Sequence, residues 1–303
     1  MSDTLHRFFI ESLHTRGEWL SLNSSWKEIQ KTSNYPKPVE NVLGEALVAI
    51  TLLADSLKFD GNLVLQIRGT SPVTMLVVQA NSTGAIRGIA HWQGDIADGS
   101  SFNELFGSGT MVISVENKPK RGAQQGERYQ SLVSLEGESL ADCFSEYFSQ
   151  SEQLNTEMWL SVNKDCAAGL LLQRLPIAED GKDDGEEWNH AKAMADTLNS
   201  EVGKQELVSL DVETLLHRLY HEEELVLYEP HPIRFECSCS QDKIEKAIYS
   251  LGRTEAEDIL KEKGAIQVDC EFCNKNYELD KVDVERVFNE GDIIHTNGTG
   301  SVH

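Results

Sequence analysis

The sequence predicts an α+β protein built from three successive regions. Up to about Pro176, runs of strand length alternate with segments of helical spacing, which is typical of a mixed α/β core. A charged, glycine-punctuated stretch at 179–187 follows, and beyond it apolar residues recur every three or four positions, which predicts amphipathic helices. The last region, from about Phe235 to Phe288, holds two close cysteine pairs. We therefore expect a core domain at 1–178, a helical linker at 179–234, a small cysteine module at 235–288 and a polar tail at 289–303.

The composition is that of an ordinary globular protein with more than one domain. The 303 residues are too many for one small core, and 40% of them are hydrophobic and 25% charged. Acidic residues number 50 and basic residues 27, so the net charge of −23 repels polyanions and acidic membrane surfaces. The longest apolar stretch, Ala46 to Ala54, is too short to cross a bilayer. We therefore expect a cytoplasmic protein that binds neither nucleic acid nor membrane.

The first region contains clear strand and helix patterns. Three β-branched or apolar runs, bounded by glycine, proline or aspartate, predict the strands Leu63–Ile67, Val73–Val78 and Met111–Val115. Apolar residues recur at helical spacing from Val39 to Leu57 behind two prolines, which predicts a core-facing helix. A second helix is predicted from Ser139 to about Gln153. We expect Cys143, on its apolar stripe, and Cys166, beside two alanines, to be small core residues.

The linker carries two apolar stripes at helical spacing. The first consists of Trp188, Ala191, Ala195, Leu198 and Val202. The second consists of Val212, Leu215, Leu216 and Leu219. We expect Gly203 to end the first helix and Asp211 to cap the second. Because short helices are marginal alone in water, these residues are predicted to cover the N-terminal domain, the largest surface available to them.

Two cysteine pairs dominate the third region. Cys237 and Cys239 form a Cys-x-Cys pair, Cys270 and Cys273 form a Cys-x-x-Cys pair, and residues 240–269 separate the two. Ligands one or two residues apart on a turn converge on one ion, and four sulfur donors suit zinc or an iron–sulfur cluster. A closed tetrahedral zinc site needs only four ligands, whereas clusters commonly use other spacings. The pattern therefore favours one zinc ion per chain.

Spacing alone leaves the role of this site open. Most closed four-cysteine sites only hold a small module together, and a module of this size buries too little apolar surface to fold without such help. A zinc-ribbon module that recruits nucleic acid or a protein partner would carry a basic face with aromatic residues, but this region has more acidic than basic residues. An enzyme with a structural zinc is a third alternative. No nucleophile or acid–base constellation supports it, and the pair His217 and His221 is expected on a solvated helix face.

Several stretches together resemble one known family. The most specific runs from Leu215 to Leu225, continues through Arg234–Ser240 with the first cysteine pair, and ends with Cys270–Cys273 followed by Tyr277. Supporting matches lie at Asn34–Pro36, Leu43–Glu45, Lys58–Gly61, Glu146–Phe148, Ser151–Gln153 and Gly169–Gln173. The chain resembles, over nearly its whole length, the redox-regulated 33-kDa heat-shock chaperones of bacteria, also called 33 kDa chaperonins.

The resemblance implies a switch rather than an enzyme. The reduced protein would hold zinc on the four cysteines and be inactive. Oxidants and unfolding stress would expel zinc and form the disulfides Cys237–Cys239 and Cys270–Cys273. The linker would then loosen, and the protein, often as an oxidised homodimer, would hold unfolding or oxidatively damaged clients without ATP. ATP-driven refolding chaperones would take over those clients.

Overall fold

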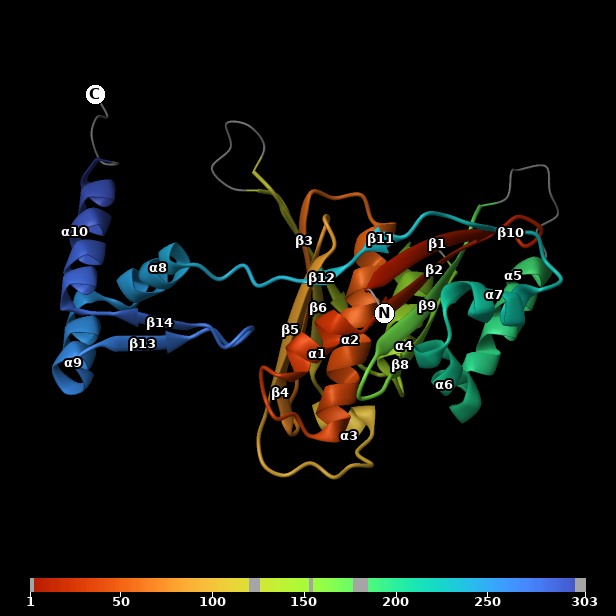
Figure 1. Cartoon of the computed structure of the whole chain (residues 1–303), viewed down its shortest axis with the longest axis horizontal. Coiled ribbons are helices and arrows are strands. Elements are labelled where there is room, and N and C mark those ends of the chain that lie inside the picture. The colour runs from red at the N-terminus through yellow and green to blue at the C-terminus, as the bar shows by residue number, and fades with distance from the viewer. Residues whose placement is uncertain (1–2, 120–125, 153–154, 177–184, 298–303) are drawn as a thin grey trace. The chain divides into compact units, whose positions relative to one another are not determined.

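The structure, a computed structural model, describes residues 3–119, 126–152, 155–176 and 185–297 (Figure 1). The chain divides into two compact units, 1–236 and 237–303, which are described separately. The expected linker at 179–234 belongs to the first unit, and both cysteine pairs belong to the second. Among the described residues, no helix combines the length and the apolar character that crossing a membrane requires.

Two sheets form the framework of the first unit. The first sheet has the strand order β10-β1-β2-β9-β8, and β11 also pairs with β1. Its strands are β1 (Thr4–Ile10), β2 (Thr15–Leu22), β8 (Thr156–Val162), β9 (Ala167–Arg174), β10 (Leu225–Leu227) and β11 (His231–Pro232). The second sheet has the order β12-β5-β4-β3-β6-β7. Its strands are β3 (Gly61–Arg68), β4 (Val73–Asn81), β5 (Ala85–Trp92), β6 (Thr110–Asn117), β7 (Arg128–Val133) and β12 (Arg234–Phe235). The three strands predicted from sequence are confirmed as parts of β3, β4 and β6.

The long helix α2 (Lys37–Ser56) packs against strands of both sheets (Figure 1). Pro36 and Pro38 flank its start, where proline fits because the first N–H groups of a helix have no intrahelical partner. The predicted helix is confirmed, and its buried residues lie at the centre of the larger core cluster. The other helices of this part are α1 (Ser24–Gln30), α3 (Phe102–Phe106) and α4 (Leu140–Tyr147), which continues as a π-helical turn at Phe148–Glu152. Together, α4 and this π-helical turn correspond to the helix predicted from Ser139 to about Gln153. Gln153 itself lies outside the described residues.

The linker region folds into α5 (Glu186–Ala195), a 3₁₀ turn (Asp196–Asn199), α6 (Glu201–Ser209) and α7 (Val212–Tyr220). The prediction that Gly203 ends a helix is wrong. Gly203 lies in the first turn of α6, where its N–H donates to the capping Ser200 Oγ at 3.0 Å. A Cβ at this position would lie 2.5 Å from Leu198 Cα, so close packing between the 3₁₀ turn and α6 requires the glycine. The predicted Asp211 cap is confirmed by its bond from Thr214 N at 2.9 Å.

A second core cluster lies between these helices and the first sheet. Eight of the nine predicted stripe residues are buried in it, at 8% exposure or less: Trp188, Ala191, Ala195, Leu198, Val212, Leu215, Leu216 and Leu219. The sheet contributes Phe8, Ile10, Trp19, Trp159, Leu170 and Leu172. Val202 is the exception, with 69% of its surface exposed, because the 3₁₀ turn breaks the helical register before it. It is not part of the covered surface.

The second unit has a small core of its own. Its elements are α8 (Gln241–Leu251), α9 (Arg253–Lys263), β13 (Ile266–Asp269), β14 (Asn276–Leu279) and α10 (Lys281–Asn297). Its buried cluster consists of Ile248, Ala256, Ile266, Leu279, Val284, Val287 and Phe288. The tail expected at 289–303 begins inside α10, because Val284, Val287 and Phe288 hold the start of that helix on the core. Residues 298–303 lie outside the described residues.

Candidate metal centre

The first cysteine pair lies in the extended segment before α8. The chain turns into the helix directly after Cys239, because the Ser240 side chain caps α8 by accepting a hydrogen bond from Lys243 N at 3.3 Å. The Lys243 ammonium reaches back and donates to the Ser238 carbonyl oxygen at 2.6 Å. These two bonds fix the backbone that carries Cys237 and Cys239.

The second pair lies in the turn between β13 and β14. Cys270 N donates to the Lys275 carbonyl at 2.9 Å, and the Cys270 carbonyl accepts from Cys273 N at 3.2 Å and Asn274 N at 2.7 Å. Asn274 has a φ of 56°, a left-handed conformation that asparagine tolerates better than most residues. The turn therefore places both side chains at the end of the two-stranded sheet.

The structure brings all four cysteine side chains together. Their Sγ atoms lie within 4.8 Å of one another, and all four residues are partly buried. Cys237 Sγ lies 3.6 Å from Cys270 Sγ, and Cys239 Sγ lies 3.5 Å from Cys273 Sγ. Four sulfurs at about 2.3 Å from a tetrahedral zinc ion lie about 3.8 Å apart, so these separations fit a closed site. In the described part of the chain, no other group of three or more histidine, cysteine or acidic side chains converges in this way.

The thiol chemistry also fits a cation. Partial burial raises the pKa of Cys239, but hydrogen bonds from Tyr277 and the neighbouring thiols lower it by more, to about 7. Burial raises the pKa of Cys270, and it raises the pKa of Cys273 to about 12. At neutral pH and without a cation, Cys270 and Cys273 therefore stay protonated. A divalent metal would stabilise their thiolate forms, which are the forms that bind metal.

One contact at this centre was not predicted. The Tyr277 hydroxyl donates to Cys239 Sγ at 3.1 Å, and this bond raises the Tyr277 pKa to about 12. Tyr277 follows Cys273 by four residues on β14, so its place near the cysteines could have been expected, although no spacing rule assigns it a sulfur partner. Hydrogen bonds of this kind commonly orient the side chains that ligate a metal, so Tyr277 would orient Cys239 if the four cysteines hold one.

The remaining candidates lie away from this centre. Cys143 and Cys166 are 1% and 3% exposed, so both are core residues as expected, and burial raises the pKa of both thiols. His217 on α7 and His221, which directly follows the end of that helix, are both exposed, also as expected.

Comparison with known proteins agrees with this description. The fold and the site define a two-unit protein of mixed helix and sheet with four converging thiols that could hold a metal ion. The chain belongs to the Hsp33 family, because it matches the family described as Hsp33 protein over residues 3–280. The 33 kDa chaperonin of Aliivibrio salmonicida is 39% identical to it over 306 residues, which cover 100% of this chain and 99% of that protein. The 33 kDa chaperonin of Azotobacter vinelandii is 43% identical over 293 residues, which cover 95% of each chain.

A solved structure shares the fold. The crystal structure of the 33 kDa chaperonin from Thermotoga maritima, a heat shock protein 33 homolog, aligns with a TM-score of 0.78 and 19% identity. The alignment covers 97% of this chain and 100% of that one. The predicted α+β fold class and the predicted family resemblance are both confirmed.

Proposed function

We propose that this protein is an ATP-independent holdase chaperone whose activity is switched by oxidation of the four cysteines. Its relatives are named 33 kDa chaperonins and match it at about 40% identity over essentially their whole length. The observation that carries the proposal is the convergence of four thiol sulfurs within 4.8 Å in a unit with a small core. A recruitment module without a switch is not favoured, because the match extends over both units and not over the cysteine region alone.

Cys237, Cys239, Cys270 and Cys273 are proposed to hold one zinc ion in the reduced protein. When bound, zinc on four thiolates contributes about 10–16 kcal/mol to the folding of small modules. The core of this unit cannot replace that contribution, because few of its side chains are buried. The state of the sulfurs therefore decides whether the unit stays folded.

Oxidation is proposed to pair Cys237 with Cys239 and Cys270 with Cys273. Each disulfide forms when two thiols release two electrons and two protons, and one molecule of hydrogen peroxide that accepts them is reduced to two waters. The Cys-x-x-Cys pair is expected to close more easily, because a Cys-x-Cys disulfide closes a smaller and more strained ring. Sulfurs bonded in pairs no longer hold a metal, and the unit then unfolds.

Unfolding of the second unit is proposed to weaken the packing of the helices α5–α7 on the first sheet. These helices cover an apolar face of the first sheet that contains Phe8, Trp19 and Trp159. Once uncovered, such a face would bind the apolar segments of unfolding proteins. No enzymatic step is required. Dimerisation of the oxidised form, hand-over of clients to ATP-driven refolding chaperones and a cytoplasmic location complete the proposal.

The test compares the two redox states directly. Light scattering of a thermally unfolding client should be suppressed by the oxidised protein and not by the reduced protein, and zinc content should be measured in the same samples. The double variant Cys143→Ser and Cys166→Ser is the matched control, because it removes the two buried thiols and should switch like the parent. Equal suppression of aggregation by the reduced and the oxidised protein would contradict the proposal that oxidation switches the activity.

A further inference from the structure

The residues between α7 and the first cysteine form an edge strand on both sheets. We call residues 225–236 the strap. Its first part, β10, pairs antiparallel with β1, and β11 pairs with β1 further along. Its last part, β12, pairs parallel with β5. The strap therefore covers one edge of each sheet in turn (Figure 1).

Main-chain hydrogen bonds hold much of the strap. Tyr228 N donates to the Arg7 carbonyl at 2.9 Å, and Ile233 N donates to the Asp3 carbonyl at 3.0 Å. On the second sheet, Arg234 N donates to the Gly84 carbonyl at 2.9 Å and Glu236 N to the Ile86 carbonyl at 3.1 Å. Such bonds do not depend on side-chain identity, so any extended chain can make them.

The side chains of the strap repeat one simple pattern. Leu225 and Leu227 are partly buried against the second core cluster, while Val226 between them is 48% exposed. Ile233 and Phe235 pack against the first core cluster, and Arg234 between them is exposed. Residues two apart on a strand share a face. Each sheet edge therefore takes up a strand whose first and third side chains are apolar and face the core, while the side chain between them can be of any kind.

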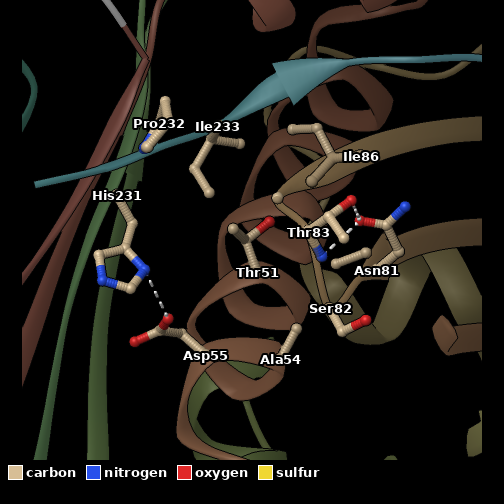
Figure 2. A pocket seen from close by; sticks show the side chains of 12 residues that line it. Thr51, Ala54, Asp55, Asn81, Ser82, Thr83, Ile86, His231, Pro232 and Ile233 are labelled. Atoms are coloured by element: carbon tan, nitrogen blue, oxygen red, sulfur yellow. Dashed lines mark hydrogen bonds and ion pairs between the residues drawn. The ribbon is translucent and has the colours of Figure 1, made fainter. Parts of the chain in front are cut away.

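The β5 edge is shaped to receive a strand. Ile233 lies beside a cavity of about 190 Å³ that Thr51 and Ile86 help to line (Figure 2). The turn before β5 is held by Asn81 Oδ1, which accepts from Thr83 N and Ala85 N at 2.9 Å each, and the strap takes no part in these bonds. Gly84 in this turn has a φ of 79°, and a Cβ there would lie 2.6 Å from the Pro232 carbonyl oxygen. Only glycine allows the strap backbone to come so close.

We propose that, in the activated protein, the strap leaves β1 and β5 and an extended segment of an unfolded client takes its place as an added strand, with two apolar residues spaced two apart in the vacated positions. The strap ends at Glu236, directly before Cys237. Unfolding of the second unit therefore leaves the C-terminal end of the strap attached to an unfolded segment. The strands that still hold the strap are short, with three residues in β10 and two each in β11 and β12. Vacated sheet edges are templates for another extended chain. This inference rests on the proposed chaperone function and specifies how the client is held.

A synthetic peptide with the strap sequence, residues 225–236, tests the proposal. It should bind the oxidised, zinc-free protein and compete with a client in the light-scattering assay, and it should not bind the reduced, zinc-loaded protein. N-methylation at Arg234 and Glu236 removes the two donors to β5 and should weaken binding at least about tenfold, at the usual worth of two hydrogen bonds. N-methylation at Phe235, whose N–H points to the other side of the strand, is the matched control and should change binding less than about threefold.

Hydrogen exchange on the full chain gives a second measurement. Amides of β1 and β5 should exchange faster after oxidation and become protected again when a client binds. Suppression of aggregation without peptide competition and without protection of β1 and β5 would overturn strand addition and leave the chaperone function intact. Failure of the oxidised protein to suppress aggregation would instead overturn the proposed function itself.

Discussion

Replacing Leu198 by glutamate should activate the protein without oxidation. Leu198 is 1% exposed in the 3₁₀ turn between α5 and α6, within the cluster that joins the linker helices to the first sheet. Loss of a buried leucine side chain alone costs about 2–5 kcal/mol, and an unpaired buried carboxylate adds several more. A total of at least about 4 kcal/mol shifts the docking equilibrium nearly a thousandfold towards the undocked state. Short helices cannot offset that cost by themselves.

Val202→Glu is the matched control for this experiment. Val202 lies four residues further on and is 69% exposed, so its replacement should leave the helices docked. Both variants are compared with the parent under reducing conditions by light scattering of an aggregating client, and zinc is assayed in each. Suppression by Leu198→Glu with full zinc content, and none by Val202→Glu, is expected. A zinc-loaded Leu198→Glu protein as inactive as the parent would show that the helices do not mask the client surface.

Three further changes have defined outcomes. The reduced protein should carry about one zinc per chain. Cys270→Ser should lose this zinc, and the control Cys143→Ser should keep it. Full zinc content in Cys270→Ser would mean that the ligands are misassigned. Burial raises the pKa of Glu18 from 4.5 to about 8, so the folded state keeps a proton that the unfolded state releases. Through this group alone, the unfolding free energy should therefore fall by about 1.4 kcal/mol per pH unit within that interval. Glu45, whose pKa burial raises to about 7, adds a fall of the same sign. Glu18→Gln should reduce the slope by the contribution of Glu18, leaving that of Glu45, in urea titrations followed by tryptophan fluorescence, which reports on the first unit because all five tryptophans lie there; an unchanged slope would assign it to other groups. Asp211→Ala removes the cap of α7 and should lower the stability of that helix by about 1 kcal/mol, which would be seen as roughly fivefold faster amide exchange in it. Unchanged exchange would show that the cap does not stabilise α7.

Local signals in the sequence predicted much of the fold. The periodic apolar residues of α2 and the Asp211 cap act within one or two helical turns, and both were predicted correctly. The cysteine spacing placed the two sulfurs of each pair close together, and the convergence of the two pairs was predicted from the metal chemistry of four sulfur donors and not from a local signal. Gly203 and Val202 were misjudged because a continuous stripe concealed the 3₁₀ turn at Asp196–Asn199, which is fixed by packing and not by spacing.

Non-local pairing accounts for the features that were not predicted. The strap pairs with strands about 150 and 220 residues earlier in the chain, and its two-residue strands carry no periodicity. Glu18 is buried on β2, in the middle of a sheet whose other strands come from distant parts of the chain, and the surrounding sequence marks it as an ordinary charged residue. Only the assembled sheet removes it from water.

The order of the strands along the chain also has a consequence for synthesis on the ribosome. Strand β9, which pairs with β2 and β8, is complete at Arg174, before any linker helix, strap residue or cysteine of the candidate metal centre has been made. The last linker helix, α7, ends at Tyr220, 46 residues after Arg174, which corresponds to roughly 2–9 s of translation. During that interval the apolar face around Trp19 and Trp159 has no helices to cover it. Each newly made molecule therefore passes through a state in which this face is exposed before its own helices exist to cover it.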